Sequence, residues 1–229
     1  MFPITTNLKP FTTPWATYAI IGANVIIHFI ITWNANLVIP SEIARTLGFV
    51  PASFGNFSTS HRLVTCMFLH GDLIHLSGNM VFLLVFGRRV ESEFGTINFL
   101  ALYFTAGVTA CLAHAIMESE STKPLVGASG AISGVLGAFL ITNPTARVTL
   151  VLDPTLIYFL RRLTVRLPAW IFLLGWFLLQ LSFALKPEAL NIALWAHIGG
   201  FAAGIIMSVA LYRYYPNSDP SRERDLAVN

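Results

Sequence analysis

Charged side chains are scarce in this chain. Its 229 residues are only 11% charged and 55% hydrophobic, and the mean hydropathy is +0.68. A soluble domain carries about a quarter charged residues, so the polar surface that would coat a soluble protein of this size is missing. The same figures exclude a disordered chain. A net charge of +3, with basic residues scattered along the chain, argues against a nucleic-acid partner. The sequence therefore predicts a multi-spanning protein of the lipid bilayer.

Cysteine is nearly absent as well. The two cysteines, Cys66 and Cys111, cannot build a disulfide framework, and they lack the paired spacing of a zinc site. We interpret both as small buried apolar residues.

Long apolar runs predict six membrane-spanning helices, because about 18 apolar residues suffice to cross a bilayer. The second and fourth runs are short and contain polar residues, so each of them, taken alone, also fits a re-entrant segment. The predicted spans lie near residues 15–33, 73–87, 97–117, 126–141, 167–185 and 192–212. The expected fold is an all-α, polytopic six-helix bundle over residues 15–213.

The distribution of basic residues predicts the orientation of this bundle. Six spans place ten basic residues on the side of the termini and four, Arg45, Arg62, Lys123 and Lys186, on the other. The positive-inside bias then puts both termini in the cytoplasm. Residues 1–14 form a cytoplasmic N-terminal segment, and residues 214–229 form a polar, disordered cytoplasmic tail. The long outer loop, 34–72, is fairly apolar and is expected to fold back on the membrane surface.

Polar side chains inside the spans mark a functional site, because they are costly in hydrocarbon. His75 and Asn79 are four residues apart and share one face of the second span. Ser129 lies about one turn into the fourth span, and His197 about five residues into the sixth. At 1.5 Å per residue, all four lie within roughly 10 Å of the outer boundary. A serine hydroxyl beside an imidazole is the minimum for an activated nucleophile.

Glycines surround the serine and follow the histidine. Gly127 and Gly130 flank Ser129 in a Gly-x-Ser-Gly segment, where missing side chains let a substrate come close. Two small-xxx-small pairs allow the fourth and sixth spans to approach each other. The pairs are Gly130 with Gly134 and Gly200 with Gly204, and Gly199 lies beside the second.

No Asp or Glu lies inside a predicted span. A Ser-His dyad is therefore simpler than a triad, which would have to borrow an acid from an outer loop. Asn79, His75 and the backbone amide of Ser129 are the candidate donors to a developing oxyanion.

Three ordered motifs resemble the rhomboid family of intramembrane serine proteases. They are His70-x4-His75-x3-Asn79-Met80, Gly127-Ala128-Ser129-Gly130 and Ala196-His197-x-Gly199-Gly200, and the spacing Gly87-x3-Glu91-x3-Gly95 is similar to that family as well. The resemblance runs from about residue 14 to residue 213. It implies a six-helix fold without a metal or organic cofactor, and cleavage of single-pass membrane proteins near the outer interface.

The resemblance also implies individual roles. Ser129 would be the nucleophile and His197 the general base and acid, while His75 and Asn79 would serve the oxyanion. Two positions depart from the family pattern. Ser133 stands where several bacterial members carry an aromatic residue that packs against the histidine, and His61-Arg62 replaces a Trp-Arg pair in the first loop.

Other interpretations of the same residues remain open. The main alternative is a rhomboid-like pseudoprotease that binds membrane helices without cutting them. A transporter needs polar groups on both sides of the membrane midplane. A haem-binding bundle needs a pair of histidines that face each other deep in the bilayer, and His28 and His114 do not form such a pair by sequence position. A metal site from His70, His75 and His197 lacks a carboxylate. His70 fits a place in a catalytic cavity and a place at the membrane interface equally well. Ser133 is better explained by helix packing than by catalysis.

The sequence leaves the oligomeric state open. Without a transit-like N-terminus, the expected location is a bacterial or archaeal plasma membrane, with the site open to the outer face.

Overall fold

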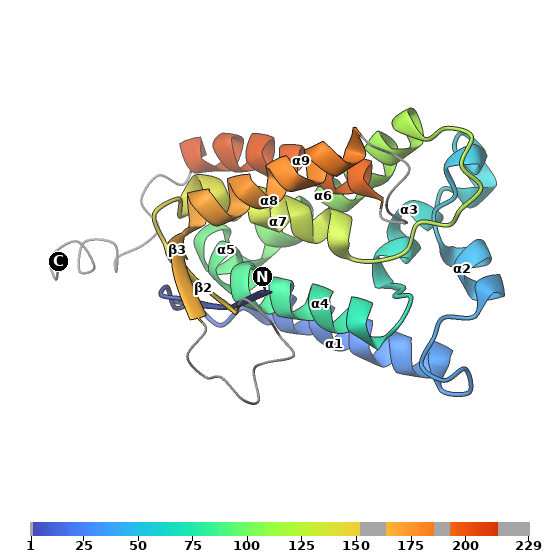
Figure 1. The fold of residues 1–229 in the computed structure, drawn as a ribbon, viewed down its shortest axis with the longest axis horizontal. Helices are drawn as coiled ribbons and strands as arrows, with labels where there is room; N and C mark the ends of the chain where they lie inside the picture. Colours follow the sequence, from blue (N-terminus) through green and yellow to red (C-terminus); the bar gives the residue numbers. More distant parts are fainter. Residues whose placement is uncertain (1, 152–163, 186–192, 215–229) are drawn as a thin grey trace, which may run out of the picture.

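The computed structural model describes residues 2–151, 164–185 and 193–214. These residues form a bundle of helices with a small β-sheet at one end and the short helices α2 and α3 at the other (Figure 1). We call these ends the sheet end and the loop end. The elements are β1 (Phe2–Thr6), α1 (Trp15–Thr32), α2 (Ser41–Leu47), η1 (Pro51–Ser53), η2 (Phe57–Thr59), α3 (Arg62–Thr65), η3 (Cys66–Phe68), α4 (Leu73–Phe82), the π-helical turn η4 (Leu83–Gly87), α5 (Arg88–Phe94), α6 (Thr96–Met117), α7 (Ser129–Thr142), β2 (Arg147–Val151), β3 (Thr164–Pro168), α8 (Ala169–Ala184) and α9 (Leu194–Tyr214).

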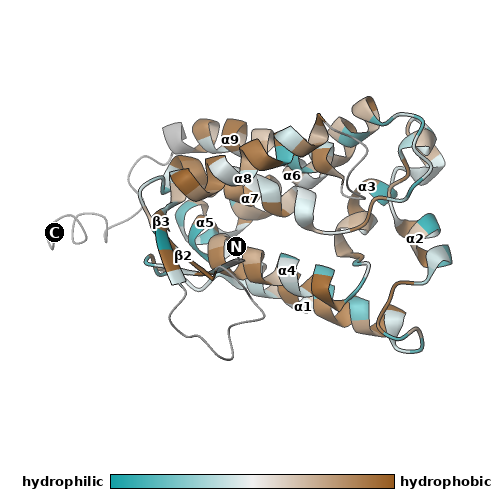
Figure 2. Cartoon of the chain, in the orientation of Figure 1, coloured by the Kyte–Doolittle hydropathy of each residue, from teal (hydrophilic) through white to brown (hydrophobic). Residues whose placement is uncertain are grey.

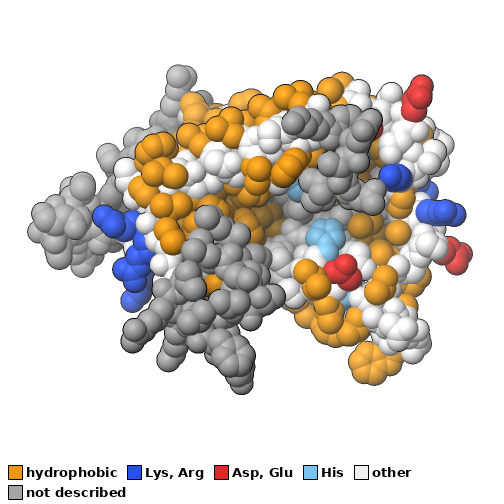
Figure 3. Space-filling model, viewed as in Figure 1, with side chains coloured by type: hydrophobic (Ala, Val, Ile, Leu, Met, Phe, Trp, Pro, Cys, Tyr) orange, Lys and Arg blue, Asp and Glu red, His pale blue; other side chains and the backbone are white. Residues whose placement is uncertain are grey.

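In the part of the chain that the structure describes, four helical segments are long and apolar enough to cross a membrane. They are Trp15–Thr32, Leu73–Phe94, Thr96–Met117 and Leu194–Leu211, and the apolar helices α7 and α8 are shorter. Hydrophilic residues gather around β3 and the loop-end segments (Figure 2). On the face in Figure 3, Lys and Arg side chains lie at the two ends, and many hydrophobic side chains lie between them. These features agree with a helical membrane protein, whereas the six spans and the cytoplasmic termini stay predictions.

The second of these segments is longer than the sequence predicts. The predicted span ended at Gly87, but the helix continues through η4 and α5 to Phe94. The continuation carries charged residues, which a hydropathy pattern assigns to a loop. Tertiary contacts of Glu91 explain why it stays helical.

Glu91 caps the beginning of α1 from the neighbouring helix. Its carboxylate accepts hydrogen bonds from the backbone N–H groups of Ala16 (2.9 Å) and Thr17 (2.8 Å), and from the hydroxyls of Thr17 (2.8 Å) and Thr96 (2.9 Å). The first N–H groups of a helix lack partners within the helix and attract negative charge. Four donors satisfy this carboxylate, which is only 1% exposed.

A three-stranded antiparallel sheet departs from the predicted all-α fold. The strand order is β1-β2-β3, so the N-terminal segment pairs with a strand that follows α7. Each strand has five residues, and β1 lies about 140 residues from β2 along the chain, which leaves little local signal. The predicted tail lies outside the described residues from 215 onward, as does the predicted start of the sixth span at Ile192.

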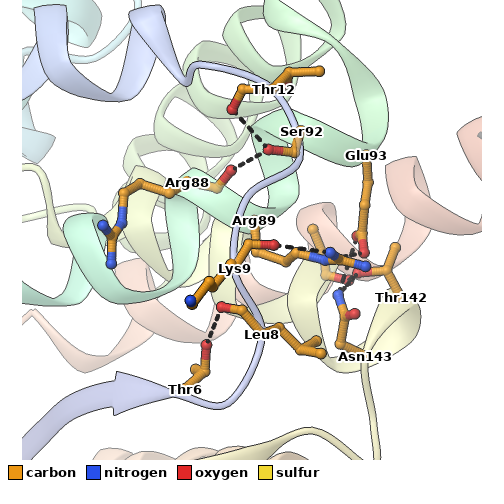
Figure 4. A network of polar contacts seen from close by, with 11 residues as sticks. Thr6, Leu8, Lys9, Thr12, Arg88, Arg89, Ser92, Glu93, Thr142 and Asn143 are labelled. Atoms are coloured by element: carbon orange, nitrogen blue, oxygen red, sulfur yellow. Dashed lines mark hydrogen bonds and ion pairs between the residues drawn. The ribbon is translucent and has the colours of Figure 1, made fainter. Parts of the chain in front are cut away.

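Polar contacts tie the chain between β1 and α1 to the sheet end (Figure 4). The Arg89 guanidinium donates to the Glu93 carboxylate (2.8 Å) and to the Lys9 carbonyl oxygen (3.0 Å), and it lies over the Phe11 ring. The Asn143 amide donates to the other Glu93 oxygen (3.1 Å). The end of α7 is thereby joined to α5 and to the N-terminal segment.

The loop of residues 34–72 packs on the bundle as a scaffold. Phe49 and Leu125 form an isolated antiparallel bridge with N···O distances of 3.0 and 2.7 Å, so this loop pairs with the segment that leads into α7. Non-helical backbone inside a membrane domain is tolerated where protein groups satisfy it. The loop therefore supports the short helix α7, whose residues from Gly130 to Phe139 are all buried.

Candidate active site

Ser129 and His197 meet near the loop end of the bundle. Ser129 is the first residue of α7, and His197 lies in the first turn of α9. The Oγ of Ser129 and the Nε2 of His197 are 2.9 Å apart, which is a hydrogen-bond distance. The structure thus brings together the two residues that the sequence singled out on separate spans.

Glycines allow α7 and α9 to touch backbone to backbone. A Cβ added at Gly200 would overlap the Gly130 carbonyl oxygen, and one at Gly204 would overlap the Gly134 carbonyl oxygen. Gly199 allows α9 to lie equally close to α6, because a Cβ at Gly199 would overlap the Ala113 side chain. Small residues permit this approach of membrane helices, and the approach brings the serine within reach of the histidine.

The two residues before Ser129 are held by the loop of residues 34–72. The N–H of Gly127 donates to the Cys66 carbonyl oxygen (2.9 Å), and the N–H of Ala128 points to the Nε2 of His70 (3.5 Å). His70 thus lies behind the segment that leads into Ser129, in contact with its backbone. Its sequence-based alternatives were the cavity and the interface, and the structure assigns it this supporting position.

Gly127 leaves a gap between His75 and Ser129. Its φ is +125°, which favours glycine. A Cβ there would lie 2.8 Å from the Nε2 of His75 and 3.7 Å from the Oγ of Ser129. The Nδ1 of His75 accepts from the Gly71 N–H (3.4 Å). A neutral imidazole that accepts at Nδ1 carries its proton on Nε2, so a donor faces this gap.

Asn79 lies one turn below His75 on α4. Its side-chain amide donates to the His75 carbonyl oxygen (3.1 Å), which leaves one amide hydrogen for another acceptor. Asp72 is the N-cap of this helix, and its carboxylate accepts from the His75 N–H (2.8 Å). Histidine side chains are visible in a hollow on the face in Figure 3.

No carboxylate orients His197 in the described part of the chain. Its Nδ1 is buried and has no hydrogen-bond partner there. Trp176 of α8 lies against the imidazole, with ring centroids 6.0 Å apart and an interplanar angle of 35°. Ser133 does not reach the ring, because its hydroxyl donates to the Ser129 carbonyl oxygen of its own helix (2.7 Å).

Trp176 is the contact that the sequence did not reveal. The fifth span was predicted from its long apolar run, and nothing in that pattern distinguishes one aromatic residue from the next. Its contact with His197 depends on how α8 lies against α9, which is set by tertiary packing.

Other candidate residues do not gather into a second site. His28 and His114 are not hydrogen-bonded to the serine or to His197, and His28 is 2% exposed with both ring nitrogens unpartnered. Within residues 2–151, 164–185 and 193–214, no group of three or more His, Cys, Asp and Glu side chains could hold a metal ion. The Sγ atoms of Cys66 and Cys111 are 3.5 Å apart, and both residues are buried free cysteines.

Acid is expected to destabilise the fold through His70. Burial, reinforced by nearby His75 and His28, lowers the pKa of His70 from 6.5 to about 3. Below pH 6.5 the unfolded chain therefore binds a proton that the folded chain does not. The stability contributed by the neutral ring is complete above pH 6.5 and is lost as the pH falls towards 3.

This linkage predicts that the contribution of His70 to the free energy of unfolding falls by about 2 kcal/mol between pH 7 and pH 5. Denaturant unfolding in detergent at the two pH values measures it. His70→Asn should reduce the pH-dependent difference of the wild-type chain by about this amount, whereas His61→Asn, at an exposed histidine of the same loop, should leave it unchanged. An equal pH dependence in both variants would contradict the assignment to His70.

Comparison with known proteins identifies a family whose model matches this chain. A family model described as Rhomboid domain matches residues 58–214, more than half of the chain. RHOMBOID-like protein 5 of Arabidopsis thaliana is 36% identical over 160 residues, which cover 66% of this chain and 43% of the plant protein. Rhomboid-like protease 3 of Toxoplasma gondii is 31% identical over 198 residues, covering 84% of this chain and 66% of that protein.

A bacterial protein is similar as well. Rhomboid protease GluP of Bacillus subtilis is 30% identical over 198 residues, which cover 86% of this chain and 35% of the bacterial protein. The matched region thus spans less than half the length of the plant and the bacterial relative.

Proposed function

The chain belongs to the rhomboid family, and on this premise we propose that it is an intramembrane serine endopeptidase with a Ser-His dyad. Its substrates are single-pass membrane proteins, which it cuts within the bilayer near the outer interface. The observation that carries the proposal is the 2.9 Å distance between the Ser129 Oγ and the His197 Nε2 on two helices in backbone contact.

The proposed chemistry follows from these two groups. The Ser129 Oγ attacks the carbonyl carbon of the scissile peptide bond while the His197 Nε2 takes its proton. The imidazolium then gives this proton to the leaving amine, and the acyl group stays on Ser129. Water attacks the acyl-enzyme with His197 again as the base, which releases the second product and restores the serine hydroxyl.

Three donors are available for the oxyanion. The Ser129 N–H belongs to the first turn of α7, where backbone donors are left free and the helix dipole favours negative charge. The Nε2 of His75 faces the gap at Gly127, and Asn79 has one amide hydrogen to offer. One such donor is worth about 3 kcal/mol of barrier in serine proteases.

We propose that six helices span the membrane and that both termini lie in the cytoplasm. Described basic residues support this orientation. The sheet end carries Lys9, Arg88, Arg89, Arg147 and Arg166, and the loop end carries Arg45, Arg62 and Lys123. The loop end, with the dyad, then faces outward. A bacterial or archaeal plasma membrane stays the expected location. Among the relatives named above, the Bacillus subtilis protein supports it, whereas the other two are eukaryotic.

The test is cleavage of a single-pass reporter in proteoliposomes. The purified chain is expected to cut it at a bond near the outer boundary, which mass spectrometry of the two products locates. Ser129→Ala should leave the reporter whole. A wild-type chain that crosslinks to the reporter without cutting it would favour the pseudoprotease alternative, and cleavage by Ser129→Ala would place the nucleophile elsewhere.

A further inference from the structure

The imidazole of His197 needs a support beyond its single hydrogen bond. Its Nε2 meets the Ser129 Oγ, while its Nδ1 is buried and has no hydrogen-bond partner among the residues that the structure describes. The terminal torsion of a histidine is broad, so one hydrogen bond leaves the ring free to tilt. Proton transfer requires the Nε2 lone pair to point at the serine. The ring plane must therefore be fixed by contacts with its faces.

The neighbouring helix α7 does not supply that contact. Ser133 follows the nucleophile by one turn, and it is only 1% exposed. Its hydroxyl is engaged with the Ser129 carbonyl oxygen (2.7 Å). The residues that follow the histidine by two and three positions, Gly199 and Gly200, have no side chains to offer.

Helix α8 supplies the contact with the face of the His197 ring. The Trp176 indole lies 6.0 Å from the His197 ring at an angle of 35°, and it also contacts Phe201 one turn further along α9 (6.1 Å). An indole face packs well against a ring and attracts a cation at this separation. It therefore suits both the neutral imidazole and the imidazolium that forms during acyl transfer.

We infer that Trp176 is a positioning residue that holds the His197 imidazole in line with Ser129, so that α8 is part of the catalytic apparatus. The inference rests on the proposed proteolytic function and extends it to a helix whose outer surface carries exposed apolar residues. The position of α8 against α9 then determines how well the base is aligned, and a displacement of α8 slows the chemistry.

The test compares two neighbouring aromatic residues of α8. Trp176→Leu removes the ring against His197. Phe177→Leu is the matched control, because Phe177 stacks on Phe201 of α9 (4.9 Å, 22°) and is likewise half-buried. Trp176→Phe keeps a ring face at the position. Each variant is assayed for reporter cleavage, with kcat and KM separated, and for its unfolding midpoint in detergent.

We expect Trp176→Leu to lower kcat about tenfold or more with KM within about twofold. Trp176→Phe should keep kcat within about threefold of wild type, and Phe177→Leu should leave it unchanged even where its unfolding midpoint falls as far. Equal kcat values for the two leucine variants would overturn the inference while the proposed function stands. A wild-type chain that cuts no reporter would overturn the proposed function and the inference together.

Discussion

A His197→Ala variant is expected to cleave a membrane reporter at least about a thousandfold more slowly than the wild-type chain. Without the imidazole, no described side chain within hydrogen-bond distance of the Ser129 Oγ can take its proton, and a neutral hydroxyl is a weak nucleophile. Removing one member of a serine-protease catalytic set typically leaves only the contribution of the oxyanion donors and of binding.

The measurement is kcat for a fluorogenic single-pass reporter in detergent, with KM determined separately. His114→Ala is the matched control, since His114 is a histidine near the end of α6 that is not bonded to the serine. It should keep kcat within a few-fold of wild type. Equal losses in both variants would indicate general damage to the fold, and no loss in His197→Ala would exclude a dyad.

Gly204→Ala is expected to cause the second large effect. A methyl group at this position would overlap the Gly134 carbonyl oxygen, so α9 has to move away from α7. Overpacking of this kind costs about 1–3 kcal/mol when side chains give way, and here the obstacle is backbone. A displacement of about 1 Å in a catalytic pair can lower the rate about a hundredfold. We therefore expect a loss of both stability and cleavage.

Gly22→Ala is the control for Gly204→Ala. Gly22 lies inside α1 and nothing surrounds the place where its Cβ would be. Alanine favours a helix by up to about 1 kcal/mol over glycine, so this variant should be as stable as wild type or more so, with unchanged cleavage. Unfolding in detergent and reporter cleavage are measured on both. Identical behaviour would refute close α7–α9 contact.

The parts of the site that could be predicted from the sequence follow from helix geometry. A rise of 1.5 Å per residue assigns Ser129 and His197 to one depth. The small residues at Gly130, Gly134, Gly200 and Gly204 predict which helices approach each other. The structure places these glycines in backbone contact and the two side chains 2.9 Å apart.

The parts that could not be predicted depend on contacts between distant segments. Helix α5 continues the second span because Glu91 reaches across to the start of α1, and a hydropathy pattern contains no such information. The sheet pairs β1, near the beginning of the chain, with β2, which follows about 140 residues later. Trp176 could not be distinguished from its aromatic neighbours, because its contact with His197 depends on the placement of α8.

The most direct test of the central claim is covalent labelling of the serine. A fluorophosphonate probe reacts with a serine that a neighbouring base activates, and the labelled peptide can be identified by mass spectrometry. The account predicts one adduct, on Ser129, which forms in the wild-type chain and is lost in His197→Ala. An adduct on Ser133 or another residue, or labelling of Ser129 at the same rate without His197, would contradict it.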